Sequence, residues 1–267
     1  MSSATNRSLR RVAVASRVVL RRVTVVGCLL AALGSLWSCG RKSKLEEGRM
    51  DIHNRAVARE DSINQALSRA DSLLVVTRIE VDSLRALLTV RQNPVGPYMV
   101  VKGSTLPQTG LEARLDDVNS GTEAVFYLVA KATGKGLNFT QIGVARDASG
   151  PWVMSETVAR DGEQNDVYGG AQTVHFMGAQ TDSIGEALSQ WGPNVGGYVL
   201  FRADNGRSFT APLSAAVASR IAIAYRYSRA LRNLQIAARD YQRLERLLET
   251  ARQHVARTMP DTVSGEK

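Results

Sequence analysis

The chain has 267 residues, with 34 basic and 25 acidic side chains, three histidines, two cysteines and a formal net charge of +9 at pH 7. Residues 1–38 hold six arginines and no acidic residue, so removal of this start lowers the net charge to +3 and with it the case for nucleic-acid binding. No His-x-x-x-His or Cys-x-x-Cys pair occurs, which argues against a zinc site.

The start of the chain has the features of a secretory signal peptide. Residues 23–36 form an apolar run that is shorter than the roughly 20 residues needed to cross a bilayer as a helix. A basic beginning, a short apolar segment and small residues at its end predict a signal peptide over residues 1–38. A signal anchor and a mitochondrial transit peptide are the alternatives, since transit peptides are also rich in arginine and poor in acids.

The end of this segment, with Leu36, Trp37, Ser38 and Cys39, resembles the lipobox of bacterial lipoproteins, although Trp37 replaces the small residue usual at its position. The resemblance implies that Cys39 begins the mature chain and is acylated. It implies an anchor in membrane lipid, in the outer membrane rather than the inner one, with the protein facing the periplasm or the cell surface. Residues 39–44 then form a basic tether attracted to anionic head groups. Since Cys28 leaves with the signal peptide, no free thiol and no disulfide remain.

Residues 45–93 are predicted to form one long helix. Ser43 and Glu46 fit a capping box before it, and Asn93 and Pro94 end it, because proline cannot continue the hydrogen-bond ladder. Apolar positions along it step by four and three, as in the seam of a coiled coil. The seam residues are Ile63, Leu67, Ala70, Leu74, Thr77, Val81, Leu84 and Leu88.

Residues 94–213 are rich in glycine and in short runs of β-forming residues. The predicted strands are residues 98–102, 111–116, 123–132, 139–146, 152–159, 173–177, 198–202 and 208–211. Residues 124–130 are apolar throughout, which predicts a central strand covered on both faces. Asn205 and Gly206 predict a hairpin turn, and residues 183–191 a short helix. The pattern is typical of a compact antiparallel β sandwich or barrel.

Residues 214–257 are predicted to form a second long helix, with Pro212 in its first turn, followed by a flexible tail over residues 258–267. Its seam consists of Tyr227, Leu231, Leu234, Ala238, Tyr241, Leu244, Leu248, Ala251 and Val255. The predicted fold class is therefore α+β, with a compact antiparallel β sandwich or barrel head between two long helices that form an antiparallel coiled-coil stalk. Alternatively, each seam pairs with another subunit of a homo-oligomer.

Candidates for metal or acid–base chemistry are sparse. His175 alternates with apolar neighbours, which predicts that it lies on the solvent-facing side of its strand. The polar loop at 160–170 could offer oxygen ligands to calcium, but its glycine is misplaced for an EF-hand, so we expect a solvated turn. The possible calcium ligands are Asp161, Glu163, Asn165 and Asp166, and the possible acid–base residues are Asp116, Asp117 and Glu123. Carboxylates flank turns by chance, so no catalytic residue, cofactor or metal is predicted.

Arginines form a stripe on the second long helix. Arg239, Arg243 and Arg246 recur at helical spacing, and acidic residues interrupt the stripe. We expect a solvated face that pairs with the first helix rather than a nucleic-acid site, because export would separate the protein from nucleic acid. A docking surface for an anionic glycan or a partner is the second interpretation.

A short pattern, Asp followed by Ser or Thr and an aliphatic residue, occurs five times. It resembles the O-glycosylation sequon of exported proteins in the Bacteroidetes, which suggests a lipoprotein from this group. The hydroxyl residues of the pattern are Ser62, Ser72, Ser83, Ser183 and Thr262. Thr262 lies in the predicted flexible tail and is the easiest to reach.

The sequence predicts a non-enzymatic, lipid-anchored scaffold or accessory protein of the cell envelope that binds a protein partner and no nucleic acid. The alternative is a glycan- or peptidoglycan-binding module that uses Trp152, Trp191 or Tyr168 as stacking platforms. An enzyme with unrecognised carboxylate chemistry is the third interpretation.

Overall fold

A computed structural model describes residues 45–116, 124–134, 138–160 and 162–259. The predicted signal peptide, the tether, Cys39 and Thr262 lie outside these ranges. The chain divides into two units, and residues 55–259 form the larger one. Of the smaller unit the structure describes residues 45–54, which are the first turns of helix α2 (Leu45–Arg85). The following description concerns the larger unit.

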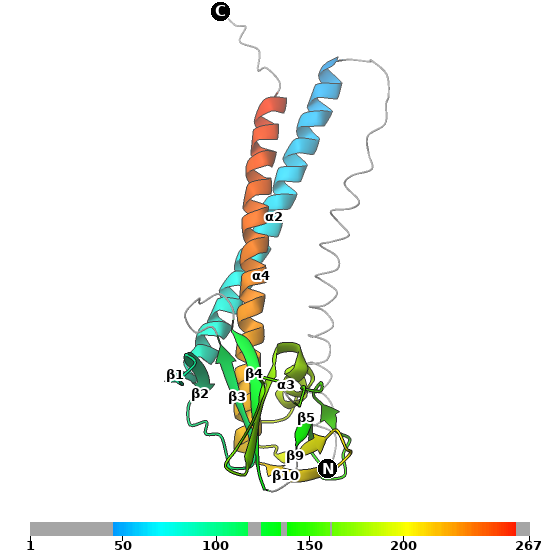
Figure 1. The fold of residues 1–267 in the computed structure, drawn as a ribbon. Coiled ribbons are helices and arrows are strands. Elements are labelled where there is room, and N and C mark those ends of the chain that lie inside the picture. Colours follow the sequence, from blue (N-terminus) through cyan, green and yellow to red (C-terminus); the bar gives the residue numbers. More distant parts are fainter. Residues whose placement is uncertain (1–44, 117–123, 135–137, 161, 260–267) are drawn as a thin grey trace, which may run out of the picture. The chain divides into compact units, whose positions relative to one another are not determined.

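Ten strands form two antiparallel sheets (Figure 1). The six-stranded sheet has the order β1 (Leu88–Gln92), β2 (Pro97–Val101), β3 (Gly110–Asp116), β4 (Val125–Thr133), β8 (Ala171–Met177) and β7 (Asn165–Tyr168). The four-stranded sheet has the order β10 (Ser208–Leu213), β9 (Gly197–Ala203), β5 (Phe139–Ala145) and β6 (Val153–Met154). A 3₁₀ turn η1 (Gly178–Thr181), helix α3 (Asp182–Ser189) and helix α4 (Ala215–Thr258) complete the described elements.

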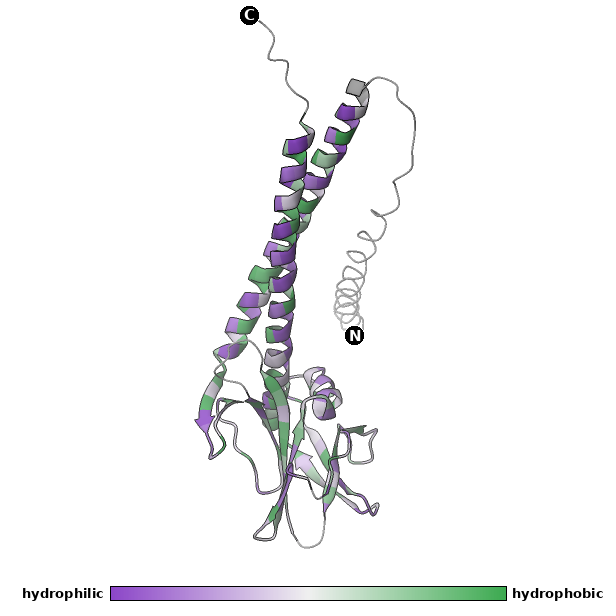
Figure 2. Cartoon of the chain, turned by 45° about the horizontal axis from the view of Figure 1, so that its top comes forward, coloured by the Kyte–Doolittle hydropathy of each residue, from purple (hydrophilic) through white to green (hydrophobic). Residues whose placement is uncertain are grey.

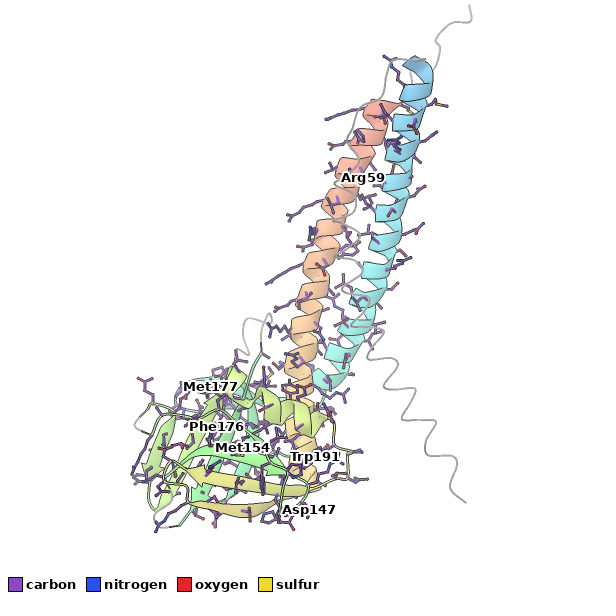
Figure 3. All side chains as sticks on the ribbon, turned by 90° about the vertical axis from the view of Figure 1, so that its right-hand side faces the viewer. Arg59, Asp147, Met154, Phe176, Met177 and Trp191 are labelled. Carbon is purple, nitrogen blue, oxygen red and sulfur yellow. The ribbon has the colours of Figure 1, made fainter. Side chains whose placement is uncertain are left out.

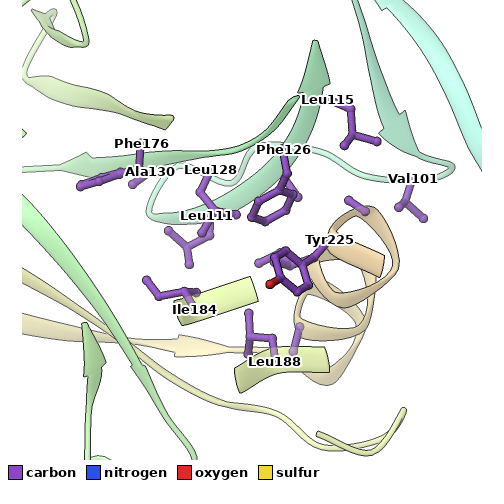
Figure 4. Packing of buried hydrophobic residues seen from close by; sticks show 14 of the residues in the cluster. Val101, Leu111, Leu115, Phe126, Leu128, Ala130, Phe176, Ile184, Leu188 and Tyr225 are labelled. Carbon is purple, nitrogen blue, oxygen red and sulfur yellow. The ribbon is translucent and has the colours of Figure 1, made fainter. Parts of the chain in front are cut away.

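One hydrophobic core joins the sheets to α3 and α4. Alternate residues of β3 and β4 face it, because successive side chains of a strand point to opposite faces. Figure 4 shows Phe126 and Leu128 of the six-stranded sheet facing Ile184 and Leu188 of α3 and Tyr225 of α4. Strand β4 lies between β3 and β8 and is buried on both faces, as the sequence predicts for residues 124–130.

The two sheets are also joined by the buried side chain of Gln172 on β8. Its Oε1 accepts a hydrogen bond from the N–H of Phe139 on β5 at 2.8 Å, and its Nε2 donates to the carbonyl oxygen of Phe139 at 2.9 Å. Nε2 also donates to Oδ1 of Asn165 on β7 at 2.8 Å. Both the oxygen and the nitrogen of this buried amide therefore have hydrogen-bond partners.

Helix α4 begins at Ala215, close to the predicted start at residue 214, but Pro212 does not lie in its first turn. Pro212 lies in β10, and Ser214 is the N-cap, whose Oγ accepts a hydrogen bond from the N–H of Val217 at 3.3 Å. The first half of α4 lies against the sheets, where Ala218, Ile221 and Ala224 are buried. This half of the helix is therefore part of the core.

The predicted two-helix coiled-coil stalk is wrong. Helix α2 ends at Arg85, and Leu88–Gln92 is strand β1 rather than the last turns of a helix. Ile63, Leu67, Ala70 and Leu74 in the middle of the predicted seam are only half-buried, whereas Val81 and Leu84 belong to the core beside the sheets. The described chain instead has two sheets of six and four antiparallel strands and three α-helices, of which α4 is the long C-terminal one. The four–three spacing reflects one-sided burial of a helix, which does not require a coiled-coil partner.

Candidate functional site

A groove with charged walls lies where α2, α3 and α4 meet, and its volume is about 280 Å³. Helix α2 contributes Glu80, and the end of α3 contributes Glu186, Ser189 and Gln190. Helix α4 contributes Tyr225, Arg226, Arg229, Ala230 and Asn233. The groove therefore offers two carboxylates, two guanidinium groups and several neutral hydrogen-bonding groups.

The charged side chains of this groove interact only weakly with one another. Nη2 of Arg226 lies 3.6 Å from Oε1 of Glu80, and the two side chains are 55% and 46% exposed. The guanidinium of Arg229 lies 6.0 Å from the centre of the Tyr225 ring. Exposed ion pairs in water stabilise a fold by about 1 kcal/mol or less, so a ligand can exchange partners with them at low cost.

Tyr225 keeps its proton at neutral pH. Burial raises the pKa of its hydroxyl, and the nearby Arg229 lowers it by a smaller effect. The side chain of Ser189, which also lines the groove, donates to the carbonyl oxygen of Glu186 at 2.7 Å. None of the described lining residues is a histidine or cysteine.

A second hollow, of about 380 Å³, lies along α4 and is lined by Arg239, Gln242, Arg243, Arg246, Leu247 and Thr250. The structure thus brings together the three arginines that the sequence predicts to form a stripe. Their described surroundings come from one helix, which gives a positive surface without a second wall that would fix a ligand's orientation.

A polar cluster lies on the face of the six-stranded sheet opposite the core. The Glu112 side chain is only 2% exposed, and its Oε2 accepts a hydrogen bond from Nε of Arg114 at 2.8 Å. Its Oε1 lies 3.6 Å from Nη1 of Arg91 and has no hydrogen-bond partner in the described structure. Arg114 lies 4.5 Å from the centre of the Tyr98 ring. Arg91 also donates to the carbonyl oxygen of Ser104 at 2.6 Å, so the cluster is tied to the β2–β3 connection.

Sequence reasoning missed Glu112. Its alternation with Leu111 and Ala113 is the ordinary signature of a solvated strand face. Nothing in the local pattern indicates that Arg91, from a distant strand, lies beside this carboxylate. The sequence held one signal for this pair. Glu112 and Arg114 are two positions apart, so their side chains are neighbours on the same face of the strand.

His175 belongs to the same sheet face, opposite Val174 and Phe176 as predicted, but it is half-buried rather than a free surface histidine. Its ring stacks on Tyr127, with ring centres 6.1 Å apart and planes at 17°. Burial lowers the pKa of His175, and Arg114 lowers it further. Burial also raises the pKa of the Tyr127 hydroxyl well above its usual range. The two rings are therefore uncharged at neutral pH.

We expect His175 to make the fold less stable in mild acid. The unfolded chain binds a proton near the usual pKa of about 6.5, whereas the folded chain binds it only at lower pH. Stability therefore falls as the pH drops from about 7.5 toward the pKa of folded His175. Urea unfolding at both ends of this range should show a smaller loss for His175→Gln than for the unchanged chain. The exposed His254→Gln serves as control, and an equal loss in all three proteins would exclude this role.

The structure describes only some of the other polar candidates. Asn165 lies in β7 rather than in a loop, and its Nδ2 donates to the carbonyl oxygen of Arg160 at 3.0 Å. Within the described ranges, no three histidine, cysteine, aspartate or glutamate side chains are grouped as a metal site requires. Asp116 ends β3, while Asp117, Glu123 and Asp161 lie outside the described residues.

The serines of the glycosylation-like pattern are exposed on helices. Ser62, Ser72 and Ser83 lie on α2, and the eleven residues from Ser72 to Ser83 are about three turns, so these two lie on one side of the helix. Ser72 donates to the carbonyl oxygen of Ser68 at 2.9 Å, and Ser83 donates to that of Glu80 at 2.8 Å. Ser183 on α3 donates to the carbonyl oxygen of Met154 at 2.9 Å.

The three aromatic residues considered for glycan stacking differ in exposure. Trp191 packs against the core, within the sheet-bearing part of the fold (Figure 3), and its ring centre lies 5.7 Å from the Arg146 guanidinium. Trp152 is also partly buried. Tyr168, on the edge strand β7, is 85% exposed. Of the three, Tyr168 alone presents most of its ring to solvent.

None of the helices in the described ranges combines the length and the apolar character needed to cross a bilayer. Comparison of the chain with protein-family models, with curated proteins and with solved structures finds no match in any of the three. The interpretation of the groove therefore rests on its own residues.

Proposed function

We propose that the protein is a lipid-anchored, non-enzymatic accessory protein of a bacterial envelope that binds a protein partner through the groove between α2, α3 and α4. The observation that carries this proposal is the mixed charge of the groove, with Arg226 and Arg229 beside Glu80 and Glu186. A polypeptide segment bearing both acidic and basic side chains complements such walls.

The neutral lining supports a polypeptide ligand further. Asn233 and Gln190 each offer an amide that donates and accepts, which matches the alternating N–H and C=O groups of an extended backbone. The membrane anchor rests on the lipobox resemblance at Cys39. An intact mass that begins at Cys39 and includes added lipid would support the anchor, whereas a species that retains Met1 would contradict it.

Photo-cross-linking in cells tests the groove. A photoreactive residue at Asn233 should give one adduct of defined mass that contains a second envelope protein. Charge reversal by Arg226→Glu and Arg229→Glu should reduce this adduct at least about tenfold, since both guanidinium groups are lost. A photoreactive residue at the exposed Arg207, in the β9–β10 hairpin, is the control. The same adduct at both positions, or substrate turnover by the purified protein, would contradict the proposal.

Glycan binding is the second candidate, and the exposed ring of Tyr168 favours it. Binding of the purified protein to isolated cell wall, lost in Tyr168→Ala with the fold unchanged, would support it. Binding that survives this change would exclude stacking on Tyr168.

A further inference from the structure

Helix α2 has a second apolar side, which we call the outer strip and which consists of Val75, Val76 and Ile79. These side chains are 53%, 64% and 63% exposed. They face away from Thr77 and Val81, which are buried on the other side of the same turns. Figure 2 shows hydrophobic and hydrophilic residues mixed along this helix. A contiguous exposed group of aliphatic side chains marks an interaction surface.

The ends of the outer strip permit another helix to approach closely. Ser72 and Ser83 lie on the same side of α2 as Val76, because these positions differ by whole or nearly whole turns. Both are small, and both hydroxyls already donate to carbonyl oxygens of their own helix. Covering them would therefore leave no donor without a partner, and unpaired buried donors are the usual cost of placing serine in an interface.

Charges beside the outer strip favour a second copy of the same helix in the reverse direction. Arg69 precedes the strip and Glu80 follows it, and their separation of about three turns places them on the same side of α2. An antiparallel copy brings the Arg69 of one subunit toward the Glu80 of the other, and the two-fold axis forms this contact twice. A parallel copy would instead place like charges together.

We infer that the outer strip is the contact of a homodimer in which two α2 helices pack antiparallel. Glu80 also lines the groove described above. The partner subunit's Arg69 therefore stands at the edge of the groove and adds a positive charge beside Glu80.

Disulfide trapping in the full-length chain tests the contact. Val76 lies near the expected two-fold axis, so Val76→Cys should give a covalent dimer on mild oxidation of native membranes. Val167→Cys on β7 is the matched control, because Val76 and Val167 are 64% and 63% exposed. The unchanged chain measures the background from Cys28 and Cys39. Equal dimer from both variants, or an adduct with a different protein at Val76→Cys, overturns the inference.

Charge reversal tests the antiparallel direction. Arg69→Glu should weaken dimerisation at least about fivefold, measured by sedimentation of the detergent-extracted full-length chain, and Glu80→Arg in the same chain should restore most of it. Circular dichroism checks that each variant is folded. A chain that stays monomeric, or a loss that the second change deepens, overturns the inference. The groove proposal is tested separately, because Asn233 would still capture its partner in a monomer.

Discussion

Replacement of Glu112 by alanine is expected to lower the free energy of unfolding by about 3 kcal/mol. The buried carboxylate holds Arg114 at 2.8 Å, and the Arg114 side chain is only 14% exposed. Without Glu112 this guanidinium stays in a site of low polarity and loses the carboxylate that neutralises it. Removing one partner of a buried ion pair costs more than replacing both partners by apolar side chains. Urea unfolding of the full-length chain measures the loss.

Two comparisons separate charge from packing at this position. Glu112→Gln keeps an acceptor for Arg114 but removes the charge, so it should cost less than the alanine change. Glu156→Ala, on an exposed loop residue, should stay within about 0.5 kcal/mol of the unchanged chain. A loss for Glu112→Ala as small as that of Glu156→Ala would show that Arg114 does not depend on this carboxylate.

Gly185→Ala is expected to destabilise the protein by about 2 kcal/mol, although alanine normally favours a helix. A methyl group at this position of α3 would lie 2.3 Å from Cδ2 of the Tyr225 ring. That ring is buried and packs edge-on against Phe126, with ring centres 5.3 Å apart, so it has little room to move. The clash must therefore separate α3 from α4. Thermal unfolding of the full-length chain measures the loss.

The same substitution at Gly48 in α2 is the matched control. A methyl group there would meet nothing within 4 Å, so Gly48→Ala should raise stability by up to about 1 kcal/mol through helix propensity alone. A double variant with Tyr225→Leu should remove most of the cost of Gly185→Ala, because the ring responsible is gone. Equal effects at the two glycines would refute the close α3–α4 contact.

Alternation of polar and apolar residues predicted most strands. The ranges at 98–102, 111–116 and 139–146 agree with β2, β3 and β5 to within about two residues, which is the usual precision for element ends. The strands β1 and β7 were missed for different reasons. Strand β7 is a polar edge strand, and its asparagine and aspartate are poor strand formers.

Strand β1 was hidden because Leu88 continues the four–three spacing of α2. The turn at residues 93–96 favours a strand here instead of a helix. Oδ1 of Asn93 accepts hydrogen bonds from the N–H groups of Val95 and Gly96 at 2.9 and 2.8 Å, which closes a hairpin between β1 and β2. Strand pairing then outweighs helix periodicity over five residues. The sequence analysis interpreted Asn93 and Pro94 as the end of a helix and not as the turn of a hairpin.

The candidate groove could not be predicted from the sequence, because its residues come from three helices far apart in the chain. Arg226 and Arg229 give no local sign of a groove, because arginines recur along the whole of α4. What spacing cannot provide is the position of α3, which depends on the contact between Gly185 and Tyr225. The Glu112 cluster was missed for a similar reason, because Arg91 comes from β1 and Glu112 from β3.

The amide of Gln172 has a consequence for how the protein opens. Its side chain bonds both the N–H and the carbonyl oxygen of Phe139, as the backbone of a neighbouring strand would. Loss of either sheet exposes this amide and leaves the other sheet with unpaired backbone groups. The two sheets are therefore coupled as one cooperative unit, and partial opening that releases only the four-stranded sheet is disfavoured.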